Sequence, residues 1–285
     1  MDRKFALIGH PLGHSLSPQI HKRLFELDGK EAEYSLLDIA PEKLSESFGD
    51  LKKLDGFNIT IPHKVSIIPL CDRLSPEAER YGSVNCVKAG EETVGYNTDV
   101  LGFTKSIEQL GASLSSKVLQ LGCGGVGRMM AIETALSGGS LTVAVLKSDE
   151  PLALEVKKEV LAQKPDAEFN IVIIGGKVLD ASDFGTEMPQ FDLLVNACPV
   201  GMFPNVDRMP CAKNVLEGVK YVFDVIYNPC ETLLYKTAVQ MGAKAMTGMA
   251  MLVLQAVAAH EIWDGASYKQ SDIDALIREM ELSIS

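Results

Sequence analysis

A glycine-rich turn in the middle of the chain restricts its fold more than any other feature of the sequence. Lys117–Leu121 has the pattern of a strand, Gly122-Cys123-Gly124-Gly125-Val126-Gly127 follows directly, and Arg128–Leu136 has the pattern of a helix. A GxGxxG segment in that context is typical of dinucleotide binding, because its glycines allow a tight turn, a close approach of the pyrophosphate and close helix–strand packing. The N–H groups that begin the helix then face the phosphates. The alternative is a turn whose glycines serve packing alone.

Apolar runs of strand length alternate with helical patterns on both sides of this turn. Such alternation predicts an α/β fold with mainly parallel sheets, and 285 residues correspond to about two domains. The stretch Asp99–Phe103 between the two series is the candidate domain boundary. Strands are predicted at Phe5–Gly9, Tyr34–Ile39, Gly56–Thr60, Ser83–Val87, Leu141–Leu146, Phe191–Val195 and Tyr221–Val225. Helices are predicted at Pro18–Asp28 with Ser17 as the N-cap, at Pro41–Leu54, Phe103–Leu110 and Pro151–Leu161, and from Gly248 to the end of the chain.

The composition narrows the class of partner. The net charge of −11 gives no general attraction for nucleic acid or for an anionic membrane, so we expect neither as a partner. Six cysteines without a CxxC spacing favour reduced thiols and no metal site. The most apolar stretch, Met249–Ala259, is about half a membrane span, and Phe5–Ile8 is too short for a signal peptide. We expect a cytoplasmic protein.

The residues after the strand Leu141–Leu146 bear on the choice of dinucleotide. An acidic residue about 20 positions after the glycine turn is typical of NAD binding, and an arginine there is typical of NADP binding. This chain has neither at the strand tip. Lys147 can meet a 2′-phosphate and Asp149 can meet a 2′-hydroxyl, although either can equally be a solvated loop charge. The cofactor is therefore predicted as NADP or NAD.

A second group of polar residues follows the strands of the N-terminal half. Taken singly, each has an ordinary structural explanation, as a cap, a turn residue or a surface charge. Their joint position at strand ends, where α/β sheets bind ligands, predicts a small ligand with several hydroxyls and a carboxylate. An extended conformation would turn the hydroxyls of Ser15 and Ser17 to the same side. The group consists of His14, Ser15, Ser17, Asn58, Thr60, Lys64, Asn85, Asn97, Thr98 and Asp99.

Eight segments in the same order resemble the shikimate dehydrogenase family, which includes quinate/shikimate dehydrogenases. They cover nearly the whole chain, and their order makes the match highly specific. The segments are Gly9–Pro18 (GHPLGHSLSP), Phe57–Lys64 (FNITIPHK), Ser83–Asn85, Gly95–Asp99 (GYNTD), the glycine turn, Asn196–Met202, Asp224–Pro229 and Gly248–Ala256.

The resemblance implies a two-lobed enzyme that reversibly reduces 3-dehydroshikimate to shikimate with NADPH, on the route to chorismate and the aromatic amino acids. It implies a substrate-binding lobe at 1–101, a Rossmann-like NAD(P)-binding lobe at 102–245, and C-terminal helices at 246–285 that complete the substrate lobe. Lys64 and Asp99 would form the catalytic pair, with Lys64 either as proton donor or as electrostatic anchor. Ser15, Ser17 and Tyr227 would bind the substrate carboxylate, and Asn58, Thr60, Asn85 and Gln255 would bind its hydroxyls. Besides Lys147 and Asp149, the cofactor would contact Gly122, Cys123, Gly124, Gly125, Val126, Gly127, Asn196, Ala197, Cys198, Val225 and Gly248.

The chain departs from the family pattern at two places. Val145-Leu146-Lys147 stands where many NADP-using relatives have Asn-Arg-Thr, and lysine is not equivalent to a bidentate arginine. Val100 stands where a glycine usually follows the Asn-Thr-Asp segment. Two alternatives follow, an NAD-dependent quinate/shikimate dehydrogenase and a non-catalytic ligand sensor on the same fold. The presence of both Lys64 and Asp99 argues against the sensor.

Overall fold

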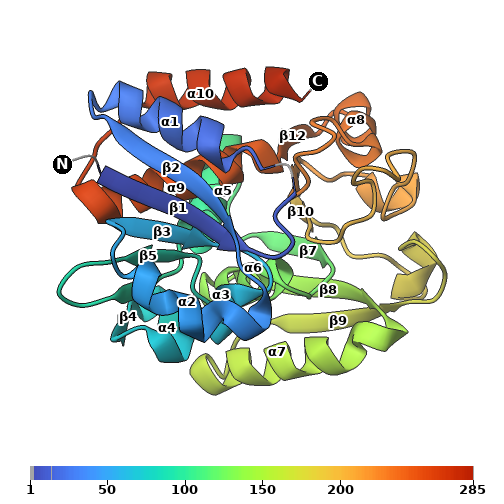
Figure 1. Ribbon diagram of the computed structural model, residues 1–285. Coiled ribbons are helices and arrows are strands. Elements are labelled where there is room, and N and C mark those ends of the chain that lie inside the picture. Colours follow the sequence, from blue (N-terminus) through green and yellow to red (C-terminus); the bar gives the residue numbers. More distant parts are fainter. Residues whose placement is uncertain (1–2, 14, 285) are drawn as a thin grey trace. The chain divides into compact units, whose positions relative to one another are not determined.

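The computed structural model describes residues 3–13 and 15–284, so His14 of the predicted polar group lies outside the described residues. The described chain divides into two compact units, each built around one six-stranded sheet. Unit 1 comprises Met1–Gly102 and Leu252–Met280, and unit 2 comprises Phe103–Met251 and Glu281–Ser285. The predicted α/β class with two lobes is confirmed (Figure 1).

The sheet of unit 1 has the strand order β2-β1-β3-β5-β6-β4. β1 pairs in parallel with β2 and β3, whereas β5 pairs antiparallel with β3 and with β6. This half-antiparallel sheet is less regular than the mainly parallel one that the sequence predicts. Its strands are β1 (Arg3–Gly9), β2 (Ala32–Asp38), β3 (Gly56–Ile59), β4 (Arg73–Leu74), β5 (Cys86–Lys88) and β6 (Val94–Tyr96).

Two parts of the chain that are far apart in sequence build the core of unit 1. Phe5 of β1 packs with Phe25 and with Trp263 in one buried cluster. The indole N–H of Trp263 donates to the carbonyl of Val87 at 2.9 Å, which satisfies the one polar atom of this buried ring. The helices and 3₁₀ turns that lie wholly or partly in unit 1 are α1 (Ser17–Leu27), η1 (Pro41–Lys43), α2 (Leu44–Leu51), α3 (His63–Ser66), η2 (Ile68–Leu70), α4 (Pro76–Tyr81), α5 (Asp99–Leu110), α9 (Gly248–Asp264) and α10 (Gln270–Ser283).

Several predicted boundaries in unit 1 are wrong for identifiable reasons. Ser17 is not the N-cap of α1, because Leu16 holds that position and no side chain caps the helix. The predicted helix Pro41–Leu54 is a 3₁₀ turn followed by the shorter α2. The predicted strand Ser83–Val87 begins only at Cys86, because the backbone N–H groups of Ser83 and Val84 donate to carbonyls of helices, those of Ala78 and Lys64.

Unit 2 has an entirely parallel sheet of order β12-β11-β10-β7-β8-β9. The chain runs outward from β7 to β9 on one side and from β10 to β12 on the other, so the strand order reverses between β7 and β10. Ligands of such sheets bind at the carboxyl ends of the strands beside this reversal. The strands are β7 (Lys117–Leu121), β8 (Ser140–Leu146), β9 (Phe169–Ile174), β10 (Leu193–Asn196), β11 (Tyr221–Asp224) and β12 (Lys244–Thr247). The helices and 3₁₀ turns are α6 (Val126–Leu136), η3 (Lys147–Asp149), α7 (Glu150–Gln163), η4 (Ala181–Phe184), η5 (Lys213–Leu216) and α8 (Leu233–Gln240).

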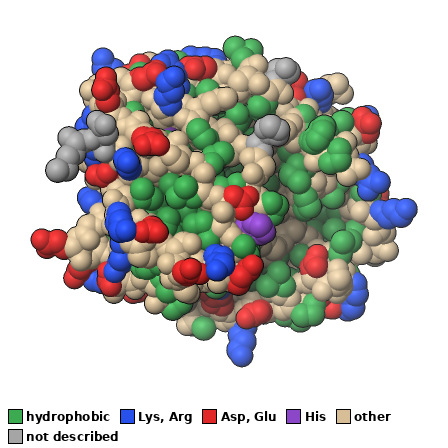
Figure 2. Space-filling model, viewed as in Figure 1, with side chains coloured by type: hydrophobic (Ala, Val, Ile, Leu, Met, Phe, Trp, Pro, Cys, Tyr) green, Lys and Arg blue, Asp and Glu red, His purple; other side chains and the backbone are tan. Residues whose placement is uncertain are grey.

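The described residues show neither a single charge sign over the face in Figure 2 nor a helix suited to a membrane. Acidic and basic side chains are interspersed over the face in Figure 2 rather than gathered into one field of a single sign. None of the helices in the described residues combines the length and the apolar character needed to cross a bilayer. Within the described ranges, no three His, Cys, Asp or Glu side chains come together as metal ligands.

Candidate active site

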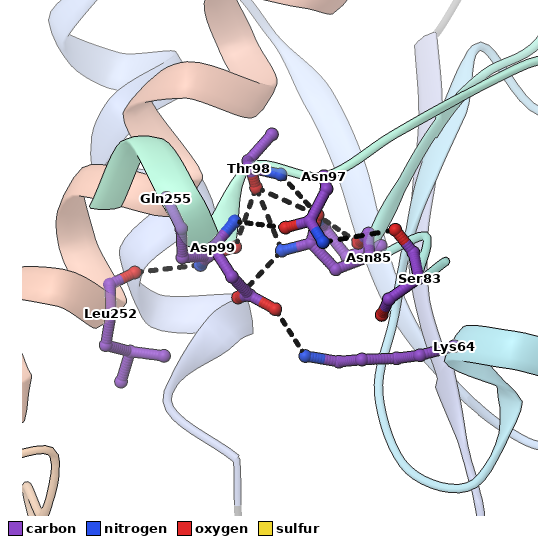
Figure 3. A network of polar contacts seen from close by, with 9 residues as sticks. Lys64, Ser83, Asn85, Asn97, Thr98, Asp99, Leu252 and Gln255 are labelled. Carbon is purple, nitrogen blue, oxygen red and sulfur yellow. Dashed lines mark hydrogen bonds and ion pairs between the residues drawn. The ribbon is translucent and has the colours of Figure 1, made fainter. Parts of the chain in front are cut away.

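Lys64 and Asp99 form an ion pair in unit 1. Nζ of Lys64 lies 2.6 Å from Oδ2 of Asp99 (Figure 3). Lys64 projects from the short α3, and Asp99 is the first residue of α5, where the positive end of the helix dipole favours a carboxylate. The side chains are 28% and 16% exposed, respectively, so the pair is partly shielded yet open to a ligand. Two predicted catalytic residues that are 35 positions apart are thus in direct contact.

Asn85 holds the other oxygen of Asp99. Its Nδ2 donates to Oδ1 of Asp99 at 2.9 Å, and its Oδ1 accepts from the backbone N–H of Thr98 at 2.7 Å. Both carboxylate oxygens of Asp99 therefore have a donor, Asn85 on one and Lys64 on the other. Asn85 is buried, so its amide has a fixed orientation and fixes that of Asp99.

The residues before Asp99 tie this pair to the C-terminal part of unit 1. The side-chain oxygen of Asn97 accepts from the backbone N–H of Asp99 at 3.1 Å, which satisfies an N–H at the start of α5. The hydroxyl of Thr98 lies 3.4 Å from Oε1 of Gln255, and Nε2 of Gln255 donates to the carbonyl of Leu252 at 2.8 Å. Gln255, a predicted substrate residue, thus joins the same network (Figure 3).

Thr98 belongs to the predicted polar group, but neither the sequence pattern nor the resemblance gives it a role of its own. Its hydroxyl contacts Asn85 and Gln255, and its backbone N–H donates to Asn85, so it links these two residues. The signal was its place in the polar run Asn97-Thr98-Asp99, but a buried threonine in such a run is usually structural.

Asn58 and Thr60 lie at the end of β3, and a partly buried tyrosine holds Asn58. The hydroxyl of Tyr34 donates to Oδ1 of Asn58 at 2.8 Å, while Nδ2 of Asn58 lies 3.4 Å from the carbonyl of Asn85. Burial raises the pKa of Tyr34 well above its usual value, so the hydroxyl remains a donor. Thr60 follows the strand, partly exposed, with its backbone N–H on the carbonyl of Ile8. No residue pattern predicts the role of Tyr34, because a tyrosine in a strand is ordinarily a packing residue.

Ser15 and Ser17 form a turn rather than an extended segment. The backbone N–H of Ser17 donates to the hydroxyl of Ser15 at 3.2 Å, and Leu16 between them has a helical conformation. The prediction of two parallel hydroxyls on an extended segment is therefore wrong, although both serines are partly exposed.

The loop that leads to these serines is anchored by Asp38 at the end of β2. Its two carboxylate oxygens accept from Nδ1 of His10 at 2.6 Å and from the backbone N–H of Leu12 at 2.8 Å. These bonds hold the pKa of Asp38 below its usual value, so the anchor is ionised at neutral pH.

The glycine loop of unit 2 has a packed inner side and an open outer side. Gly122 has a φ of +86°, and a Cβ added there would lie 3.1 Å from Cβ of Cys198. A Cβ on Gly127 would lie 3.0 Å from that of Ala197, so neither position accommodates a side chain without movement. By contrast, a Cβ on Gly124 or Gly125 would meet nothing within 4 Å. The loop therefore offers an unobstructed surface, followed by the N–H groups of α6, which suits a pyrophosphate.

Asn196 is the last residue of β10, and Ala197 and Cys198 follow it beside this loop. Asn196 is fully buried, and its Nδ2 donates to Oδ1 of Asp224 at 2.9 Å. Asp224 also accepts from the hydroxyl of Thr232 at 2.6 Å, and burial raises the pKa of this carboxyl. Asn196 thus ties the ends of β10 and β11 together.

Val225 and Gly248 are brought into contact within unit 2. The backbone N–H of Gly248 donates to the carbonyl of Ile226 at 3.1 Å, and a side chain at Gly248 would collide with the carbonyl of Val225. Tyr227, two residues after Val225, also belongs to unit 2 and is 36% exposed, whereas the other predicted substrate residues belong to unit 1.

Lys147 and Asp149 lie on the exposed 3₁₀ turn after β8. Lys147 is paired with Glu150, a residue to which the sequence pattern assigns no role. Asp149 accepts from the hydroxyl of Ser148 at 3.2 Å. Neither charge is buried, so both can reach a ligand.

Known proteins resemble this chain both in its N-terminal part and over nearly its whole length. Residues 7–87 match the family model described as the shikimate dehydrogenase substrate binding domain. The chain is 36% identical over 279 residues to the shikimate dehydrogenase (NADP(+)) of Caldanaerobacter subterraneus, covering 96% of each. It is 34% identical over 265 residues to that of Methanocaldococcus jannaschii, covering 91% of this chain and 90% of the relative. A crystal structure of shikimate 5-dehydrogenase from Thermus thermophilus with NADP(H) and shikimate superposes with a TM-score of 0.82 at 29% identity, covering 97% of this chain and 99% of that one.

Proposed function

This chain belongs to the shikimate dehydrogenase family, and from that premise we propose that it interconverts 3-dehydroshikimate and shikimate with NADP as the hydride carrier. The observation that carries the proposal is the pair of Lys64 and Asp99, held at 2.6 Å and partly exposed. We assign the substrate to unit 1 and the dinucleotide to unit 2. In the proposed role the protein serves the route to chorismate and the aromatic amino acids.

Lys64 is the residue that acts on the reacting oxygen. Reduction of a ketone places negative charge on its oxygen, and that charge needs a cation and then a proton. The ammonium of Lys64 can supply both, while Asp99 orients it. In the direction of shikimate oxidation, the neutral amine of Lys64 accepts the proton of the hydroxyl and becomes the ammonium. When bound, the nicotinamide supplies or accepts the hydride.

The remaining polar groups of unit 1 suit a ring with a carboxylate and several hydroxyls. We assign the carboxylate to the hydroxyls of Ser15 and Ser17, with Tyr227 as a further contact, and the ring hydroxyls to Asn58, Thr60, Asn85 and Gln255. Nδ2 of Asn85 donates to Thr98 and to Asp99, and its Oδ1 accepts from the backbone N–H of Thr98, so a substrate hydroxyl must share Oδ1 with Thr98.

The open glycine loop and the cation after β8 support the assignment of NADP. Gly122, Cys123, Gly124, Gly125, Val126 and Gly127 would hold the pyrophosphate, and Asn196, Ala197, Cys198, Val225 and Gly248 would line the rest of the cofactor. Lys147 is the cation available for a 2′-phosphate in place of the arginine common in the family. Its pairing with Glu150 must be exchanged for the phosphate when NADP binds. Asp149 would instead favour the 2′-hydroxyl of NAD.

Two features support a cytoplasmic protein that acts without nucleic acid. All six cysteines are free thiols, as is usual in a reducing compartment. The net charge of −11 opposes attraction to a polyanion. We propose a monomer or a homodimer.

The decisive assay oxidises shikimate and quinate, each with NADP⁺ and with NAD⁺, and follows the absorbance of the reduced nicotinamide. We expect the highest kcat/KM for shikimate with NADP⁺. Lys147→Ala should raise the KM for NADP⁺ by about tenfold and leave that for NAD⁺ unchanged, whereas Lys158→Ala on α7 should change neither. Preference for quinate with NAD⁺ would instead identify a quinate dehydrogenase. The absence of turnover with all four pairs would overturn the proposal in favour of a ligand sensor.

The carboxylate site has its own test. Replacing both Ser15 and Ser17 by alanine removes two hydroxyl donors, and we expect the KM for shikimate to rise by about tenfold or more with kcat nearly unchanged. Ser35→Ala, which removes an exposed hydroxyl from β2, is the matched control. An unchanged KM in the double variant would mean that the carboxylate is bound elsewhere.

A further inference from the structure

We propose that Gln120 is a positioning residue for the cofactor, because its side-chain amide fixes the backbone of the glycine loop from beneath. The proposal rests on the assignment of the dinucleotide to unit 2. Gln120 lies in β7 between apolar neighbours and is fully buried. It contacts backbone groups of the loop and is not placed against the ligand itself.

The amide of Gln120 connects the two ends of the loop. Its Nε2 donates to the carbonyl of Gly122 at 2.9 Å and to the carbonyl of Gly127 at 2.7 Å. Gly122 ends the strand side of the loop, and Gly127 lies in the first turn of α6. Since one nitrogen serves both carbonyls, it sets how far apart the two ends of the loop stand.

The bond to Gly122 also determines which way the loop presents its donors. In a trans peptide the carbonyl and the following N–H point in opposite directions. With the carbonyl of Gly122 turned toward Gln120, the N–H of Cys123 is turned to the opposite side of that peptide. The next two residues, Gly124 and Gly125, have the open outer surface described above. We call the two hydrogen bonds from Nε2 of Gln120 the clamp. The clamp thus holds the loop in the orientation that an anion requires.

An apolar side chain at this position would lower the free-energy cost of burial. A buried amide costs free energy unless it is bonded, and Oε1 of Gln120 has no partner among the described residues. A leucine would avoid that cost but would leave the carbonyls of Gly122 and Gly127 without this donor. The benefit of glutamine therefore lies in the geometry of the loop.

The test compares Gln120→Leu and Gln120→Met with Leu119→Ala. Leu119 is the preceding residue of the same strand, fully buried and directed to the opposite face of the sheet, so its replacement destabilises unit 2 without touching the clamp. We expect both Gln120 variants to raise the Kd for NADP⁺ by about tenfold, with the KM for shikimate within about twofold of the wild type. Leu119→Ala should lower the melting temperature and leave the Kd for NADP⁺ within about twofold.

Hydrogen exchange of the cofactor-free protein separates the clamp from the proposed function. We expect faster exchange of the amides from Cys123 to Arg128 in both Gln120 variants and unchanged exchange there in Leu119→Ala. If the wild type fails to bind NADP⁺, the assignment of the cofactor fails, whereas the exchange rates still test the clamp. The inference is overturned if a folded Gln120 variant keeps wild-type exchange in the loop, if it binds NADP⁺ as the wild type does, or if Leu119→Ala weakens NADP⁺ binding equally.

Discussion

Replacing Lys64 by methionine should lower kcat for shikimate oxidation by about a thousandfold. Methionine keeps an unbranched stem of similar reach but has no ammonium, so the oxygen of the substrate loses both its cation and its proton partner. The Kd for NADP⁺ should stay within about twofold of the wild type, because Lys64 belongs to unit 1 and the effect arises in the transition state.

The control for this variant is Lys43→Met, which removes an exposed lysine of unit 1 paired with Glu46. It should leave kcat unchanged. Lys64→Arg separates the two possible roles, since arginine retains the charge but does not give up its proton near neutral pH. Substantial activity in the arginine variant identifies an electrostatic anchor, and its loss identifies the proton donor. Wild-type turnover in Lys64→Met would remove this residue from the mechanism.

Asp99→Asn should lower kcat by about a hundredfold or more. Asparagine has nearly the same shape, but its NH₂ group must face either the ammonium of Lys64 or the NH₂ group of Asn85, and both of these are donors. Asparagine is also well tolerated at the start of a helix, so the melting temperature should change little.

Two further variants make the result for Asp99 specific. Asp50→Asn removes an exposed carboxylate paired with Lys53 and should be silent in kinetics. Combining Asp99→Asn with Asn85→Asp restores a donor opposite an acceptor but moves the charge away from Lys64. We expect this double variant to remain impaired. Recovery of the wild-type kcat would mean that hydrogen-bond complementarity, and not the position of the charge, is what the reaction needs.

Much of the fold follows from local sequence patterns. Several strands with continuous apolar runs, such as β1 and β8, and the glycine turn between β7 and α6 lie where the sequence predicts them, whereas β9 and β12 are not predicted. The short strands β4 and β6 were not predicted, because two or three residues carry no period and depend on pairing with neighbours. The predicted N-cap of α1, Ser17, is wrong because Leu16 already has a helical conformation. The sequence pattern around Pro18 does not reveal this.

The candidate site was predictable only in part. Lys64 and Asp99 stand in recognisable segments, but the bond between Tyr34 and Asn58 links strands that are not adjacent in the sheet. Such a contact depends on the register of β1, which lies between them, and no single segment encodes it. Gln120 is visible in the sequence as an amide inside the apolar run Val118–Leu121. Its hydrogen bonds to the carbonyls of Gly122 and Gly127 can be known only from the structure.

The composition of unit 1 from two distant parts of the chain has a consequence for synthesis on the ribosome. Unit 2 is almost entirely continuous in sequence, so it can fold as soon as Met251 has left the exit tunnel. Unit 1 lacks Trp263 until unit 2 has been made, and until then Phe5 and Phe25 have no indole to pack against. The segment that holds Phe5 and Phe25 is therefore made well before it can reach its native state. During that interval it exposes apolar surface of the kind that chaperones bind.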